Sequence, residues 1–278
     1  MEVRERENIV TRNPGEGAGP KFQRLVDILA ALRGPGGCPW DREQDAKSIA
    51  GYFLEEVYEA VDSLDQGDPK ALAEELGDVL MEVVFLARIF EEKGDFDAAA
   101  ALDGINEKLI RRHPHVFGGP PVQDAAGVLV VWNREKRKEK NRTSPFEGIP
   151  ESAPSLLRAF QIGQRAAHEA FDWPAAGDAL AKVREELDEI DAALAGGRSG
   201  EIEEEIGDAL FALAQAARLA KANPELVLRR ANAKFMARFL ELQKDFAARG
   251  RALRDATPAE MDAVWEEIKK GASPISGK

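Results

Sequence analysis

The chain of 278 residues has a single cysteine, Cys38, three histidines and no apolar run long enough to span a bilayer. One cysteine excludes an intramolecular disulfide, and a zinc site built on a cysteine cluster is excluded with it. No histidine lies in Glu-x-x-His, the pattern that di-iron carboxylate bundles carry on two helices, which excludes that class as well. The N-terminus lacks the apolar core of a signal peptide, so the expected compartment is the cytoplasm.

The chain also has fewer basic than acidic residues. The chain has 38 Lys and Arg against 50 Asp and Glu, a net charge of −12. Nucleic acids and anionic membranes are bound by clustered Lys and Arg, so neither partner is expected. Alternating apolar and polar runs bounded by hairpin turns are absent too, and we expect an all-α protein with little or no sheet.

Acidic residues are abundant, and one segment rich in them occurs twice, about 130 residues apart. EEVYEAVDSLDQGDPKALAEELGD, Glu55–Asp78, returns as EELDEIDAALAGGRSGEIEEEIGD, Glu185–Asp208. Each copy has Glu-Glu-x-x-Glu on one helical pattern, a turn with glycine, and Glu-x-x-Asp on a second helical pattern. This repeat favours two tandem helical-bundle domains of similar build.

Each copy predicts a helix hairpin with four carboxylates at one level. The carboxylates form two pairs, and the members of each pair are equally far from the turn glycine, Gly67 or Gly197. Both helices rise about 1.5 Å per residue, so equal distance from the turn means equal height. The carboxylates are Glu56, Glu59, Glu75 and Asp78 in the first copy and Glu186, Glu189, Glu205 and Asp208 in the second.

Such a group of carboxylates is costly without a cation. Two unit charges about 4 Å apart repel by roughly 4 kcal/mol at an effective dielectric constant near 20. An all-oxygen site suits Mg²⁺, with Mn²⁺ as a substitute, and Mg²⁺ usually keeps positions for water and substrate phosphates. The alternative is a solvated acidic face, as charge-rich helices often show. The same mirror symmetry in both copies favours the metal.

The remaining patterns predict the domain boundaries. Residues 1–20 are polar and rich in Gly and Pro, which predicts a disordered lead. Helical patterns then predict a first domain over 21–140 and a second over 155–278. The intervening segment, 141–154, has the Pro, Gly and Ser content of a linker.

Several sequence motifs, considered together and in the order in which they occur along the chain, resemble those of the MazG family of nucleoside triphosphate pyrophosphohydrolases. They are the two carboxylate patterns, CPWD at Cys38–Asp41, RRHPHVFG at Arg111–Gly118, FDWP at Phe171–Pro174 and NAKFMARF at Asn232–Phe239. The resemblance covers nearly everything from Lys21 to about Lys270. It implies an all-α fold of the helical nucleotide-pyrophosphatase superfamily, usually paired as homodimers. It also implies Mg²⁺-dependent conversion of a nucleoside triphosphate to the monophosphate and pyrophosphate.

The resemblance also implies roles for individual residues. The eight carboxylates named above would be metal ligands. The substrate-binding residues would be Lys234, Arg238, Trp265 and Asn232, with Lys108 and Arg112 as the first-domain counterparts of the basic pair. For Trp265, stacking on a base and packing in a core are equally open, because large aromatics carry much core burial.

Two positions depart from the family pattern. Many members have an Asn seven residues after the Asp of Glu-x-x-Asp, where this chain has Phe85 in the first domain and Gln215 in the second. A Lys one turn before Glu-x-x-Asp is replaced by Glu201, with Arg198 as the nearest basic residue. We therefore expect the main site in the second domain and a degenerate copy in the first.

The expected reaction is attack of an activated water between the α and β phosphates. A hairpin carboxylate that is not fully committed to the metal would take the proton, and Glu185 and Glu189 are both candidates. Lys234 and Arg238 would neutralise charge on the leaving pyrophosphate. Two alternatives stay open: a narrower pyrophosphatase for particular (d)NTPs or signalling nucleotides, and a metal-binding helical regulatory module without turnover.

Overall fold

The computed structural model describes residues 17–124, 127–128, 131–132, 135 and 144–271. Every regular element within these ranges is helical, which confirms the all-α expectation. None of the helices there combines the length and the apolar character needed to cross a bilayer. The chain divides into two units, Met1–Asn141 and Arg142–Lys278, and the division falls at the start of the expected linker. Most of the expected lead lies outside the described residues.

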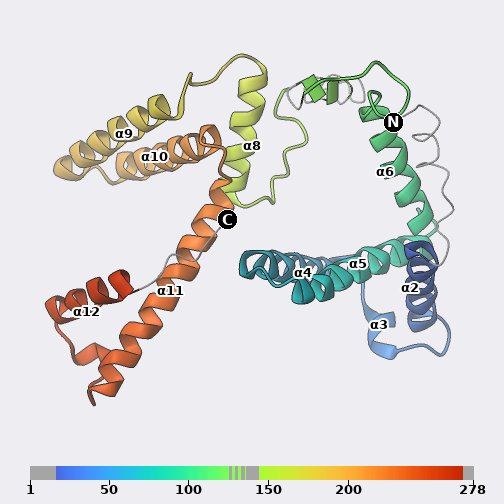
Figure 1. The fold of residues 1–278 in the computed structure, drawn as a ribbon, viewed down its shortest axis with the longest axis horizontal. Helices are drawn as coiled ribbons and strands as arrows, with labels where there is room; N and C mark the ends of the chain where they lie inside the picture. Colours follow the sequence, from blue (N-terminus) through green and yellow to red (C-terminus); the bar gives the residue numbers. More distant parts are fainter. Residues whose placement is uncertain (1–16, 125–126, 129–130, 133–134, 136–143, 272–278) are drawn as a thin grey trace. The chain divides into compact units, whose positions relative to one another are not determined.

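The first unit contains five helices with described bounds (Figure 1). They are α2 (Ala18–Arg33), α3 (Pro39–Glu43), α4 (Ala46–Gln66), α5 (Pro69–Glu92) and α6 (Ala98–Arg112). Helix α2 begins at Ala18, so the last three residues of the expected lead are helical. Pro20 fits there because an N–H in the first turn of a helix has no intrahelical acceptor to lose.

Helices α4 and α5 form the expected antiparallel hairpin. Gly67 ends α4 with φ 70° and ψ 29°, a left-handed conformation that glycine adopts at little cost. Helix α5 follows at once, because Asp68 accepts hydrogen bonds from the backbone N–H groups of Lys70 (2.9 Å) and Ala71 (3.1 Å). Pro69 occupies the first helical position, where proline is favoured. This short turn brings residues equally far from Gly67 to the same height.

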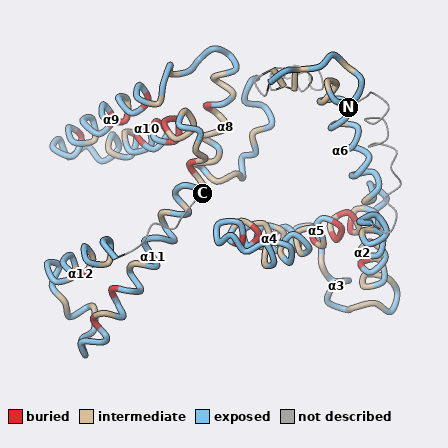
Figure 2. Tube along the Cα trace, viewed as in Figure 1, coloured by how far each residue is buried: buried red, intermediate tan, exposed pale blue. Residues whose placement is uncertain are grey.

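The core of the first unit lies where α2, α4 and α5 meet. Its buried members are Leu29, Ile49, Val84, Phe85 and Ile89. Figure 2 shows buried residues gathered on α5 beside α2. At the edge of this core Arg33 forms an ion pair of 2.8 Å with Glu92, and its guanidinium lies 5.2 Å from the Phe85 ring centroid. Phe85, which departs from the family pattern, is therefore a core residue.

The second unit has a hairpin like that of the first unit, and further helices follow the hairpin toward the C-terminus. Its elements are α8 (Ser155–His168), α9 (Ala176–Gly196), α10 (Ser199–Leu219), α11 (Pro224–Ala248), a 3₁₀ turn η1 (Leu253–Asp255) and α12 (Pro258–Gly271). Gly197 closes the hairpin with φ 66°, as Gly67 does in the first unit. A capping box opens α12, because Thr257 N–H donates to Glu260 (2.8 Å) and Glu260 N–H donates to Thr257 Oγ1 (3.3 Å).

A buried glutamine joins α10 to α8. Gln215 is 0% exposed, and its Nε2 donates to the Ala159 carbonyl oxygen at 2.8 Å. Arg218 Nε donates to Gln215 Oε1 at 2.8 Å, and the same guanidinium pairs with both carboxylate oxygens of Asp172. This network links α10 to α8 and to the Phe171–Pro174 segment. Because a buried polar group must keep its hydrogen bonds, Gln215 is committed to the fold.

The fit of Gln215 depends on Gly163 of α8. A Cβ atom at Gly163 would lie 1.6 Å from Gln215 Oε1. We expect Gly163→Ala to lower the free energy of unfolding by about 1–3 kcal/mol, because overpacking outweighs the better helix propensity of alanine. Urea unfolding would measure this loss.

Gly177→Ala on α9 is the matched control, since its Cβ would meet nothing within 4 Å. We expect this substitution to leave stability unchanged or raise it by up to about 1 kcal/mol. Two variants of equal stability would contradict the packing role of Gly163.

Candidate metal centre

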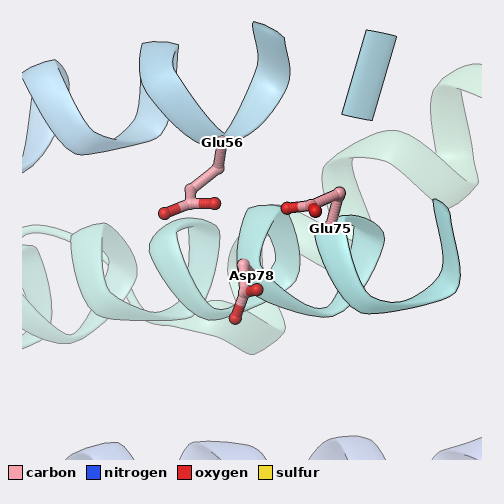
Figure 3. A group of neighbouring side chains, drawn as sticks. All are labelled: Glu56, Glu75 and Asp78. Carbon is pink, nitrogen blue, oxygen red and sulfur yellow. The ribbon is translucent and has the colours of Figure 1, made fainter. Parts of the chain in front are cut away.

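The α4–α5 hairpin brings three carboxylates together, which we call the first cluster: Glu56, Glu75 and Asp78. One oxygen from each lies within 4.8 Å of the others, and all three residues are half-buried. Figure 3 shows Glu56 on α4 and Glu75 and Asp78 on the facing helix α5. Glu59 is exposed, but its charge acts on Glu56 and Glu75. Three of the four expected carboxylates thus lie together, and Glu59 is near enough for its charge to act on two of them.

The first cluster carries unbalanced negative charge. Burial raises the pKa of Glu56, and the charges of Asp78, Glu59 and Glu75 raise it further. Burial and then the charges of Glu59 and Asp78 raise the pKa of Glu75. Raised values mean that the fold disfavours the ionised carboxylates when nothing compensates them.

A further carboxylate, Glu82, was not among the expected site residues. It lies one turn after Asp78 on α5 and is only 5% exposed. Burial raises its pKa, and the charges of Glu56 and Asp78 add to the effect, so Glu82 lies beside the first cluster. The sequence contained one signal for it, since Glu75, Asp78 and Glu82 share one stripe of the helix.

The α9–α10 hairpin forms a second cluster of Glu186, Glu205 and Asp208, again with oxygens within 4.8 Å of one another. Glu186 is buried, Glu205 is half-buried and Asp208 is exposed. Glu189 is exposed, and it lies close enough to Glu186 and Glu205 to shift the pKa of both. Burial, followed by the charge of Glu189, raises the pKa of Glu205. Three of the four expected carboxylates lie together in this copy as well, with Glu189 near Glu186 and Glu205.

A lysine compensates the second cluster. Lys182 Nζ lies 2.6 Å from Glu186 Oε1 and 2.8 Å from Glu185 Oε1. Its hydrogen bond is the main cause that lowers the pKa of Glu186. Lys182 was not among the expected site residues, although it stands four residues before Glu186, a separation at which helical side chains meet. The corresponding residue of the first unit is Tyr52, so the two clusters differ in charge.

The expected substrate-binding residues of the second unit lie on α11 and α12. The Trp265 ring centroid is 5.3 Å from that of Phe235, and Trp265 also packs against the core of Leu242, Phe246 and Val264. The pKa of Glu266 on α12 is lowered mainly by Lys269 and to a smaller extent by Arg238.

Lys234 and Asn232 are exposed on α11, while Arg238 is half-buried and its Nε has no hydrogen-bond partner. Among the described contacts of one chain, none joins Lys234, Arg238 or Trp265 to the second cluster. The hairpin therefore gathers the carboxylates, and the basic pair lies elsewhere on the chain.

The first-domain counterparts also lie on a separate helix. Lys108 is half-buried on α6, and Arg112 ends that helix with its guanidinium 5.0 Å from the Trp132 ring centroid. At the turn of the second hairpin Arg198 forms an ion pair of 2.6 Å with Glu201. Arg198, the nearest basic residue before the second Glu-x-x-Asp, is thus paired at the turn.

Both clusters have the donor set of a site for a hard divalent cation. All their ligand atoms are carboxylate oxygens within 4.8 Å of one another. Mg²⁺ and Mn²⁺ prefer such oxygens, and a bound cation would remove the repulsion that raises the pKa of Glu56, Glu75 and Glu205. The residues present therefore fit the cation that the carboxylate pattern indicated.

Lys182 competes with a cation for Glu186. We expect Lys182→Met to increase Mg²⁺ affinity at the second cluster by on the order of tenfold, because a nearby positive charge is removed. In EDTA the variant should be less stable than the wild type, because Glu186 is left buried and unpaired. Thermal melts with Mg²⁺ and with EDTA measure both effects.

Lys244→Met on α11 is the control, since Lys244 is also paired with a glutamate three residues away. That variant should respond to Mg²⁺ as the wild type does. A Lys182→Met chain with an unchanged response to Mg²⁺ would contradict the competition.

Comparison with known proteins identifies relatives across both units. The protein-family model described as "MazG nucleotide pyrophosphohydrolase domain" matches residues 44–117 and 177–244. The nucleoside triphosphate pyrophosphohydrolase of Escherichia coli K12 is 40% identical over 256 residues, which are 90% of this chain and 97% of the relative. The nucleoside triphosphate pyrophosphohydrolase/pyrophosphatase MazG of Thermotoga maritima is 38% identical over 254 residues, 91% of this chain and 98% of that protein. The Bacillus subtilis protein YabN is 38% identical over 253 residues, which are 52% of its length.

Proposed function

This chain belongs to the MazG family of nucleoside triphosphate pyrophosphohydrolases, and from that premise we propose that its second cluster, with Mg²⁺, is the main hydrolytic site. The protein is a hydrolase that cleaves nucleoside triphosphates to the monophosphate and pyrophosphate. We choose the second cluster because Lys182 and Glu186 form an ion pair there. It keeps one buried ligand ionised, and the exposed Asp208 leaves the cluster open to a substrate.

The residues of this cluster have separable roles. Glu186, Glu205 and Asp208 would hold the cation. When bound, Mg²⁺ supplies charge neutralisation on phosphate oxygens and lowers the pKa of water. Glu189 is exposed beside Glu205 and is the better candidate for the general base, because Glu185 is paired with Lys182.

A main site in the second unit predicts that substitutions of two equivalent glutamates, Glu205 and Glu75, lower the hydrolytic activity to different extents. We expect Glu205→Gln to lower the rate of hydrolysis by on the order of 100-fold or more, because it removes a ligand of the catalytic cation. Glu75→Gln, its equivalent in the first unit, should keep most of the activity. Release of monophosphate and pyrophosphate from the eight canonical NTPs and dNTPs, with Mg²⁺ and with EDTA, measures this.

Glu204→Gln is the matched control, an exposed neighbour on α10 outside the cluster. Equal losses in Glu205→Gln and Glu75→Gln would contradict a main site in the second unit. Turnover of one nucleotide out of the panel would identify a narrower enzyme. Release of single phosphate, or no metal-dependent turnover, would favour the metal-binding module instead.

We further propose that the protein is a homodimer. Both hairpins expose apolar side chains at matching positions, each between 41% and 59% exposed: Leu64, Leu76, Leu80 and Val83 on the first, and Leu194, Ile206, Leu210 and Leu213 on the second. Contiguous exposed apolar surface usually marks an interface. A second copy of the same chain offers the same surface in return, as two-fold symmetry requires.

A dimer also offers a place for the basic pair. Lys234 and Arg238 do not contact the second cluster of their own chain in the described residues, yet a leaving pyrophosphate needs positive charge. We propose that α11 of one chain supplies Arg238 to the cluster of the other. Mixing inactive Glu205→Gln and Arg238→Ala chains should then restore up to about a quarter of wild-type activity, because half of the dimers would hold one intact site of two.

Light scattering controls this experiment by reporting whether the mixed chains are dimers, at twice the 30.4 kDa chain mass. Dimers without recovered activity would place Arg238 and the cluster in one chain. Full activity of the Arg238→Ala protein would show that Arg238 is not part of the site.

We also propose that the protein acts in the cytoplasm on free nucleotides. A single cysteine suits a reducing compartment, and a net charge of −12 disfavours binding to nucleic acid or anionic membranes. Free nucleotides remain accessible to such a protein, because a bound cation can accept their phosphates.

A further inference from the structure

A single arginine connects α11, η1 and α12. Arg251 follows the end of α11 by three residues and donates to Glu260 on α12 through Nη1 (2.7 Å) and Nη2 (3.3 Å). Nη2 also donates to the Asp255 carbonyl oxygen in η1 at 2.9 Å. The guanidinium lies 5.9 Å from the centroid of the Phe246 ring on α11. The side chain of Arg251 therefore contacts all three elements at the turn.

Glu260 makes more hydrogen bonds than its capping box requires. Its carboxylate accepts from the N–H and the hydroxyl of Thr257 (2.8 and 3.0 Å) as well as from Arg251. The hydrogen bond from Arg251, followed by those from Thr257, lowers the pKa of Glu260 to about 2, so the ion pair is present near neutral pH. The two charged side chains are 43% and 44% exposed, and exposed ion pairs add little stability. The two-point contact instead fixes a direction between two helices.

Helix α12 brings an aromatic ring to the basic face of α11. The ring centroids of Trp265 and Phe235 are 5.3 Å apart, and those of Phe235 and Phe239 are 6.2 Å apart. Phe235 is 57% exposed, and Lys234 and Arg238 lie one residue before it and three residues after it. Aromatic rings stack on bases and basic side chains contact phosphates, so this surface has the chemistry that a nucleotide requires.

The turn and the aromatic surface are connected through α12. Figure 1 shows α12 turning back beside α11 after η1, and the two helices share the core of Leu242, Phe246 and Val264. Trp265 follows Glu260 by five residues, which is about 7.5 Å along the helix. The angle between α11 and α12 at the turn therefore decides how the Trp265 ring meets Phe235.

We propose that Arg251 and Glu260 are positioning residues for nucleotide binding, because their ion pair holds Trp265 against Phe235 in the orientation that receives the base. This inference rests on the proposed function, since a base is present only if the protein binds nucleoside triphosphates. The pair acts through Trp265 and does not touch the nucleotide. It therefore affects the affinity for the substrate and leaves the hydrolytic step at the carboxylates unchanged.

The test compares KM with kcat in full-length variants, with Mg²⁺ and the nucleoside triphosphate that the wild type hydrolyses fastest. We expect Arg251→Gln to raise KM by about fivefold or more and to leave kcat within about twofold, because base stacking is weakened and the chemistry is not. Arg249→Gln is the matched control. Arg249 also pairs with a carboxylate, Asp245, and lies 5.7 Å from the Phe246 centroid, but both partners are on α11. Its KM should equal that of the wild type.

Two further variants separate positioning from stability. Glu260→Gln keeps a residue that suits a capping box but removes the charge that Arg251 pairs with, so KM should rise as in Arg251→Gln. Thr257→Ala removes the side-chain cap and should lower the melting temperature, while the ion pair and KM are retained. A KM that follows the melting temperature through all these variants would contradict a positioning role.

A double variant tests whether the pair acts through Trp265. Trp265→Leu keeps an apolar side chain in the core and removes the aromatic ring, so it should raise KM by itself. Adding Arg251→Gln should then raise KM by less than about twofold more, because coupled residues are not additive.

Unchanged KM in Arg251→Gln, or additive effects in the double variant, would overturn the inference while hydrolysis by the wild type leaves the proposed function intact. A wild type without metal-dependent turnover would contradict the proposed function itself, and the inference with it.

Discussion

Mutual repulsion among carboxylates is the constraint on which this structure depends. Each hairpin places three carboxylate oxygens within 4.8 Å of one another, where like charges resist the approach of the helices. The helices nevertheless stay paired. The turns at Gly67 and Gly197 fix their antiparallel course, the core shared with α2 supports the first hairpin, and the hydrogen bond of Gln215 to α8 supports the second. The fold thus keeps a strongly acidic site assembled, which is the condition under which a divalent cation and its phosphate ligands are bound.

The two units meet this constraint with different residues. In the second, Lys182 balances Glu186, and the buried Gln215 ties the hairpin to α8. In the first, Phe85 fills the place of Gln215 with an apolar side chain, and Glu82 adds a carboxylate beside the cluster. The two helix hairpins therefore share their geometry but differ in the charged side chains around their carboxylate clusters. This divergence leaves a lysine beside the carboxylates of the second unit and uncompensated carboxylates in the first.

The phosphate chemistry needs positive charge that neither hairpin supplies in full. Lys182 is paired with carboxylates, and Lys234 and Arg238 lie on α11, which packs against α12 and also meets α8 and α10. The exposed apolar positions repeat on both hairpins, as expected if each faces another chain. An acidic hairpin, a separate basic helix and exposed apolar surface together favour a site that is completed by assembly.

The sequence by itself determined the helical fold, the two hairpins and the meeting of their carboxylates. Counting residues from Gly67 and Gly197 was enough, because the rise of a helix is fixed and a left-handed turn favours glycine. Only the tertiary structure decided the burial of Glu82, the pairing of Lys182 and the packing of Trp265 against Phe235. Helical periodicity places a residue on a stripe, but burial and pairing depend on which helices cover that stripe and on the side-chain rotamer, and neither is encoded in spacing.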